Sequence, residues 1–314
     1  ASSTWAADPA SMDSEAPTGT ESRSPTCSIV AAKPSTAIAT NAITAIERMR
    51  SAVSLPVVGS SAPSARSRCL GRCVGFLLAF GISFGIMSMN QAGALVHVYE
   101  DGSIRLNHGG TEMGQGLFIK VAQIVAGVFG VPVERVRITA TSTAEVPNTA
   151  PTAASTGTDL NGWAAQIAAT TIRTRMAEQA AADWGVAPEE VRFEEDEVFA
   201  GNHRMGFGEL AHRCVANRVS LSQTGFYKTP GIHWDPAAMK GEPFFYFSYG
   251  AAIAEVELDL LTGEHRLLRA DMVQDCGRSL NPSVDLGQIE GAFVQGLGWL
   301  TCEELWWDAE GRLR

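Results

Sequence analysis

The feature that most limits the fold is an abrupt change in composition near residue 79. Residues 1–78 are rich in Ser, Ala, Thr and Pro, contain few aromatic side chains and show no sustained period of 2 or 3.6 residues. Such a segment buries too little apolar surface to offset the entropy lost on ordering. We therefore expect residues 1–78 to be a low-complexity segment, either disordered or translated in a shifted reading frame. Residues 79–314 are then expected to form the folded domain.

An apolar stretch at this boundary, from Val74 to Met89, contains no charged residue. It is shorter than the roughly 20 apolar residues that a membrane-spanning helix needs. Its glycines favour a buried strand with a turn instead. We therefore expect no membrane association, and a membrane-anchored start remains the alternative.

The charge of the chain argues against nucleic acid as a partner, and its cysteine spacing argues against a zinc or iron–sulfur site. The formal net charge is −10, and its acidic excess lies after residue 78, which disfavours nucleic acid as a partner. None of the six cysteines belongs to a C-x-x-C pair, the usual start of a zinc or iron–sulfur site. Scattered reduced thiols are typical of cytosolic proteins, so a cytoplasmic location is expected.

Beyond residue 90 the sequence changes repeatedly between strand and helix patterns. Segments 92–99 and 103–109 flank an Asp-Gly pair, which predicts a hairpin closed by a type I′ turn. Two strand-like segments around Thr262-Gly263 predict a second hairpin. Helical periodicity is found at residues 114–129 and 159–183, from about Phe207, and after Pro282. Hairpins and helices without regular βαβ alternation predict an α+β fold.

The stretch HGGTEMGQGL, His108–Leu117, places four glycines directly before a predicted helix. Its spacing matches neither of the two common phosphate-binding patterns, G-x-x-x-x-G-K-[ST] and G-x-G-x-x-G. Glycines let a backbone approach a ligand closely, and free amides at a helix start attract anions. The charge of Glu112 would repel a phosphate, so we expect this side chain to join a local network.

Two further helix starts have the same small, polar character. TAASTGTD, residues 152–159, opens the second long helix, and LGQ, residues 286–288, lies at the start of the last. Three such starts predict one extended, anionic ligand held between them. A tight turn packed against a neighbouring strand is the alternative for each loop.

No residue is predicted to bind a metal ion directly. His97 and His108 lie on or beside strands and have no partner at ligand spacing. We therefore expect both to be structural, hydrogen-bonded histidines.

Long segments of the sequence resemble the molybdenum hydroxylase family, which contains xanthine dehydrogenases and aldehyde oxidases. The similar segments, in order, are residues 90–117, 146–162, 219–230 and 281–305. The similarity runs from about Phe80 to the end of the chain. Several long motifs in the same order make this pattern more specific than a single glycine loop.

The resemblance implies that these loops hold the pyranopterin and phosphate of the molybdenum cofactor, in its molybdopterin form or as the cytosine dinucleotide. The implied contacts are Gly114, Gln115, Ala154, Ser155, Thr158 and Gln288. Gln295 is a further candidate, for which a helix position without a ligand is the alternative.

The resemblance also implies an oxidoreductase that hydroxylates hypoxanthine and xanthine to urate, with water as the oxygen source. Its 2Fe-2S and FAD groups would belong to other domains or subunits, and the full enzyme would be a dimer. The general-base glutamate of the family belongs to a motif expected beyond Arg314, so no catalytic residue is assigned in this chain. The alternatives are an aldehyde oxidase-type enzyme and a non-catalytic cofactor-binding or assembly remnant.

A chain that supplies only part of such a site should be inactive by itself. We expect the chain expressed alone neither to retain the molybdenum cofactor nor to hydroxylate hypoxanthine. Metal analysis and a urate assay on the purified chain would check this, and appreciable turnover would contradict it.

Overall fold

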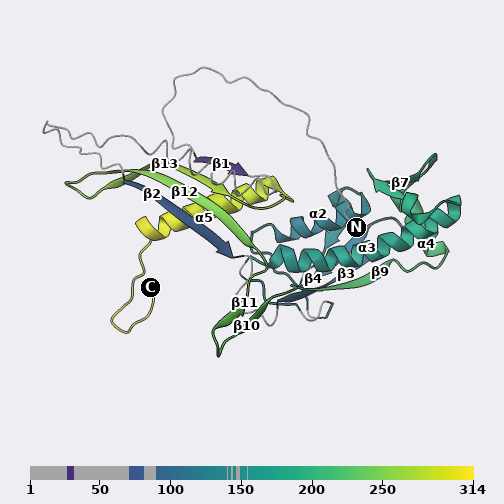
Figure 1. The fold of residues 1–314 in the computed structure, drawn as a ribbon, viewed down its shortest axis with the longest axis horizontal. Coiled ribbons are helices and arrows are strands. Elements are labelled where there is room, and N and C mark those ends of the chain that lie inside the picture. The colour runs from purple at the N-terminus through teal and green to yellow at the C-terminus, as the bar shows by residue number, and fades with distance from the viewer. Residues whose placement is uncertain are drawn as a thin grey trace, which may run out of the picture.

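The computed structural model describes residues 27–31, 71–80, 90–139, 141–142, 144–145, 149–153 and 155–314. Helices and hairpins are interspersed along the chain, so the fold is α+β, as predicted (Figure 1). Two strands lie wholly or partly before residue 79, namely β1 (Cys27–Ala31) and β2 (Gly71–Phe80). The remainder of residues 1–78 is outside the described residues, and the boundary at 78/79 stays a prediction.

A four-stranded sheet carries the first part of the domain. Its strands are β3 (Gln91–Val98), β4 (Ile104–His108), β5 (Val136–Ile138) and β9 (Ser222–Lys228), in the order β5-β4-β3-β9. The β3 strand pairs antiparallel with both β4 and β9, whereas β4 and β5 run parallel. This sheet places the end of β4, and so the start of the glycine-rich loop, beside the interior strand β3.

The first predicted hairpin is present, but its turn differs from the expected type I′. The Gly102 N–H donates to the Tyr99 carbonyl, and the Tyr99 N–H donates to the Ser103 carbonyl. Of the turn residues only Gly102 has a positive φ, of 80°, whereas a type I′ turn needs positive φ at both central positions. The turn is therefore the three-residue kind that ends in a left-handed glycine. Asp101 stabilises it by accepting from the Ser103 N–H and hydroxyl.

Two helices lie on one face of this sheet (Figure 1). They are α2 (Leu117–Phe129) and α3 (Gly157–Trp184), and both confirm predicted helices. Buried residues of α2 recur at helical spacing, as in Val121, Val125 and Phe129. Gly130 ends α2 with a left-handed φ of 64°, a conformation that glycine adopts without strain.

The face of α3 that meets the sheet is made of small side chains. Ala164, Ala165, Ala168 and Ala169 are fully buried on it. At Gly225 in β9, a Cβ atom would overlap the carbonyl oxygen of Ala164. Helix and strand backbones therefore touch, which is possible only because neither element carries a bulky side chain there.

The remaining elements of the first part are short. They are the 3-10 helices η2 (Val133–Arg135) and η3 (Pro188–Glu190), the antiparallel strands β6 (Arg192–Glu194), β7 (Glu197–Ala200) and β8 (His203–Gly206), and the helix α4 (Phe207–Ala216). The α4 helix confirms the helix predicted from about Phe207.

The second part of the domain contains the second predicted hairpin, β12 (Phe247–Leu258) paired antiparallel with β13 (His265–Gln274). Their sheet has the order β1-β13-β12-β2, with β1 parallel to β13 and β2 antiparallel to β12. A small hairpin of β10 (His233–Asp235) and β11 (Lys240–Glu242) precedes it. The last helix, α5 (Pro282–Thr301), starts at the predicted proline.

The hydrophobic core lies almost entirely in the first part. The cluster of buried apolar residues runs from Ala92 to Leu221. In the second part, among side chains that the structure describes, only Ala251, Ala270 and Met272 are buried apolar residues, and α5 buries none. The first part is therefore packed tightly enough to hold side chains of a site in fixed positions. The α5 helix contacts this part mainly through its first turn.

The contact between α3 and β9 gives a stability test. Gly225→Ala should destabilise the chain by about 3 kcal/mol or more, because a methyl group would force helix and strand apart. Gly127→Ala is the matched control: a Cβ at this position of α2 meets no described atom within 4 Å, so the substitution should stabilise the chain by about 0.5–1 kcal/mol. Denaturant unfolding of both variants would check the pair. Equal effects would contradict the close packing.

Candidate functional site: three loops around the glycine segment

The glycine-rich segment between β4 and α2 has two positions that favour glycine through their backbone conformation. Gly114 and Gly116 have φ values of 95° and 73°. A Cβ on Gly114 would meet no atom of the described residues within 4 Å, so the backbone there is open toward them. Gly110 is favoured for a steric reason instead: a Cβ at this position would lie 2.7 Å from the side-chain amide nitrogen of Asn161. The segment thus packs against α3 at one end and is accessible at Gly114.

The Glu112 carboxylate accepts hydrogen bonds from backbone amides at and just before the start of α2. It accepts from the backbone N–H groups of Gly114 at 2.8 Å, Gly116 at 3.1 Å and Phe118 at 2.9 Å. Burial raises the pKa of Glu112, but these hydrogen bonds and one from Leu117 outweigh it and hold the pKa below its usual value. The network role predicted for Glu112 is confirmed. The backbone amides at this helix start, which we expected to attract a ligand anion, instead donate to the Glu112 carboxylate.

Gln115 has a loop-forming role. Its Oε1 accepts from the Met113 N–H at 2.5 Å, and its Nε2 donates to the Thr111 carbonyl at 2.9 Å. The side chain therefore closes the loop around the exposed Gly114. Whether Gln115 also contacts a ligand stays a prediction.

The second loop, before α3, lies directly against the glycine segment. The Thr111 N–H donates to the Thr152 hydroxyl at 2.8 Å, and a Cβ on Gly109 would overlap the Thr149 side chain. Ser155 is exposed and has a left-handed φ of 59°. Thr158 is half-buried in the first turn of α3, and Ala154 lies outside the described residues.

The first turn of α5 reaches the same segment. A Cβ on Gly116 would lie 2.7 Å from Val284, and Lys120 of α2 forms a 2.5 Å ion pair with Asp285. Gln288 follows on the exposed surface of α5, and Gln295 lies two turns further along, also exposed. The three predicted helix starts are therefore brought together around the glycine segment.

These helix starts differ in how their free amides are satisfied. Glu112 caps α2, and the Asn281 side chain caps α5 by accepting from the Val284 N–H at 3.1 Å. In the part of the chain that the structure describes, no side chain caps α3, whose N-cap residue Thr156 donates its hydroxyl to the Ala153 carbonyl. The backbone amides at the start of α3 are therefore left without a side-chain acceptor in the described residues.

His108 is a structural residue, as predicted. It is 2% exposed, its Nδ1 accepts from the Gly110 N–H, and its ring packs edge-on against Phe118 at 5.2 Å between centroids. Burial lowers the pKa of His108 to about 4, although the charge of Glu112 opposes this shift. His97 is half-buried with its ring 6.3 Å from that of Tyr99. Within the described residues, no group of three or more His, Cys, Asp or Glu side chains is arranged to hold a metal ion.

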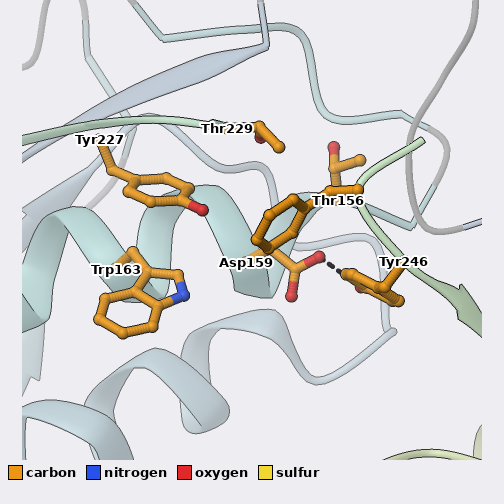
Figure 2. A pocket seen from close by; sticks show the side chains of 7 residues that line it. Thr156, Asp159, Trp163, Tyr227, Thr229 and Tyr246 are labelled. Atoms are coloured by element: carbon orange, nitrogen blue, oxygen red, sulfur yellow. Dashed lines mark hydrogen bonds between the residues drawn. The ribbon is translucent and has the colours of Figure 1, made fainter. Parts of the chain in front are cut away.

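Sequence reasoning missed a polar pocket beside the start of α3 (Figure 2). Its lining residues are Thr156, Asp159, Trp163, Tyr227, Thr229, Phe245 and Tyr246. Tyr246 donates a hydrogen bond to Asp159, and Trp163 stacks on Tyr227 with 5.8 Å between ring centroids. The acidic residue in the first turn of α3 was a visible signal, but its tyrosine partner is 87 positions away in the sequence.

Asn161 was also missed. It is 3% exposed, donates to the Gly157 carbonyl at 2.9 Å, and lies against Gly110. A polar residue on the inner side of a helix start, next to the buried Leu160, was the available signal.

The chain belongs to the family of molybdopterin cofactor-binding domains, whose family model matches residues 60–314. Its relatives include xanthine dehydrogenases: the chain is 50% identical to xanthine dehydrogenase of Dictyostelium discoideum and 47% identical to xanthine dehydrogenase/oxidase of Gallus gallus. These matches cover 70% and 72% of this chain but 15% of each relative. The resemblance to molybdenum hydroxylases is therefore confirmed, and the chain spans a small part of the length of these relatives.

Solved structures show the same fold at lower sequence identity. Quinoline 2-oxidoreductase from Pseudomonas putida 86 matches with a TM-score of 0.66 at 24% identity, over 88% of this chain and 34% of that one. The Cu,Mo-CO dehydrogenase matches with a TM-score of 0.65 at 20% identity, over 88% and 33%. Of the helices that the structure describes, none is long and apolar enough to span a membrane.

The Glu112 cap gives a pH-dependent stability test. The folded-state pKa of Glu112 is depressed, so its contribution is present above its unfolded-state pKa and is lost as the pH falls through the folded-state pKa. At pH 7, Glu112→Gln should destabilise the chain by about 1 kcal/mol, the usual value for a lost cap. The difference from wild type should shrink in acid.

Urea unfolding at a series of pH values measures this difference. Glu178→Gln, on the exposed surface of α3, is the control and should be neutral throughout. A Glu112→Gln effect that is independent of pH would argue against the charged cap.

Proposed function

We propose that this chain forms one side of the pyranopterin site of a xanthine dehydrogenase-like molybdenum hydroxylase. The observation that carries the proposal is that two other helix starts contact the glycine segment, through Thr111–Thr152 on one side and Gly116–Val284 on the other. All three loops belong to segments that resemble the family, and the family model covers them.

The residues present fit such a cofactor. The open space at Gly114 admits a flat ring system close to the backbone, because no side chain projects there. The uncapped start of α3, with the hydroxyls of Ser155 and Thr158, suits a phosphate. Gln288 would offer an amide from the first turns of α5. Gln115 would hold the loop in shape, and Ala154 stays in the proposed contact set from its place in the motif.

The site would bind and orient the cofactor. When bound, the cofactor supplies the metal centre at which oxygen from water is transferred to a substrate carbon. This chain contributes the shape of the site, the hydrogen-bond donors for the phosphate, and a backbone that admits the pterin.

The proposed substrates are hypoxanthine and xanthine, because the more similar relatives carry the name xanthine dehydrogenase. Electrons would pass to 2Fe-2S and FAD groups on other domains or subunits of a dimeric enzyme. An aldehyde oxidase-type activity is the alternative within the same family. Turnover of hypoxanthine and of an aromatic aldehyde by the assembled enzyme distinguishes the two, and cofactor without turnover would indicate a non-catalytic remnant.

The phosphate role of the α3 start is testable with an added charge. Thr158→Asp should lower the pyranopterin content of the assembled enzyme at least about tenfold, because like charges in contact repel by more than about 1.4 kcal/mol. An acidic residue in a first turn favours the helix dipole, so the fold should be kept. Thr174→Asp, on the exposed surface of α3, is the control.

Fluorescence of the oxidised pterin released from each purified protein measures the content. Equal content in Thr158→Asp and Thr174→Asp would refute the placement of the phosphate at α3.

A further inference from the structure

Asp159 and Tyr246 join two distant parts of the chain beside the proposed site. Asp159 lies in the first turn of α3, one residue beyond Thr158, and Tyr246 lies immediately before β12. The Tyr246 hydroxyl donates to the Asp159 carboxylate at 2.5 Å (Figure 2). The bond thus connects the alanine-packed helix of the first part with the strand hairpin of the second.

Aromatic side chains line the pocket that holds this bond. They are Trp163, Tyr227 and Phe245. Burial raises the pKa of Asp159, although the hydrogen bond from Tyr246 opposes that shift. The pKa of Tyr246 is also raised, first by burial and then by this bond. Burial is the first cause of both pKa shifts, and the hydrogen bond joins the two groups at the start of α3.

The aromatic side chains on either side of Tyr246 are largely exposed. Its neighbours Phe245 and Phe247 are 54% and 44% exposed, in contrast to the fully buried alanines of α3. Among the described residues, the second part also joins the first near the site where Lys120 pairs with Asp285 and Asn281 donates to Gln123 at 3.2 Å. These two polar connections lie on either side of the glycine segment.

We propose that the Tyr246–Asp159 hydrogen bond positions the first turn of α3, and with it the Ser155 and Thr158 side of the pyranopterin site, relative to the β12–β13 hairpin. This inference rests on the proposed function. Tyr246 and Asp159 act as positioning residues: they hold the helix start in place and make no contact with the substrate.

Three variants of the assembled enzyme test this role. Tyr246→Phe removes only the donating hydroxyl. Asp159→Asn keeps an acceptor oxygen and should behave as the conservative rescue. Tyr227→Phe removes a hydroxyl from the same pocket and leaves the Tyr246–Asp159 bond in place.

The first measurement is amide hydrogen exchange over residues 155–163, in enzyme produced by cells that make no molybdenum cofactor. Tyr246→Phe should speed exchange about fivefold, the ratio that the loss of one ordinary hydrogen bond gives. Tyr227→Phe and Asp159→Asn should exchange like wild type. The second measurement is pyranopterin content in cofactor-producing cells, which should fall in Tyr246→Phe alone.

Each outcome decides the proposal. Equal exchange in Tyr246→Phe and Tyr227→Phe overturns it, and so does faster exchange in Tyr246→Phe with wild-type pyranopterin content. A wild-type enzyme that carries no pyranopterin overturns the proposed function itself, and the positioning role with it, whatever the exchange result. Selective loss of both protection and pyranopterin in Tyr246→Phe supports both proposals.

Discussion

The arrangement of the site depends on the contact between α3 and β9. Gly225 lets the strand backbone touch the carbonyl oxygen of Ala164, and buried alanines continue this contact along the helix. A helix packed backbone to backbone cannot slide or rotate without overlap. The body of α3 is therefore held on the sheet from Ala164 onward, and Asn161 near its start lies against Gly110. The loop before α3 and the glycine segment share one rigid support.

Charge is distributed unevenly over the three helix starts that meet there. The chain satisfies the amides of α2 with Glu112 and caps α5 with Asn281, whereas α3 receives no side-chain cap in the described part of the chain. The proposed phosphate at α3 would therefore displace no side-chain cap of the described residues. Asp159 also lies in this first turn; burial raises its pKa, and its carboxylate accepts the Tyr246 hydroxyl.

Much of the fold could be predicted because its signals are local. The period of Val121 and Val125, ended by Gly130, predicted α2, and Pro282 marked the start of α5. The type I′ turn was wrong because the Asp-Gly pair is compatible with several turns, and the choice depends on the strand register at Tyr99. The motifs also pointed to Gly114, at which a Cβ would meet no described atom within 4 Å, but its contact with a cofactor stays a prediction.

What the amino-acid sequence by itself determined was the order and type of most elements, the network role of Glu112, and the family through its long motifs. Tertiary structure decided which helix start is left uncapped, how Gln115 is used within its loop, and the pairing of Tyr246 with Asp159. The physical reason is the sequence separation over which each kind of interaction acts. Helical periods and caps act over a few residues, whereas a hydrogen bond between residues 87 positions apart exists only after the sheets and α3 have packed.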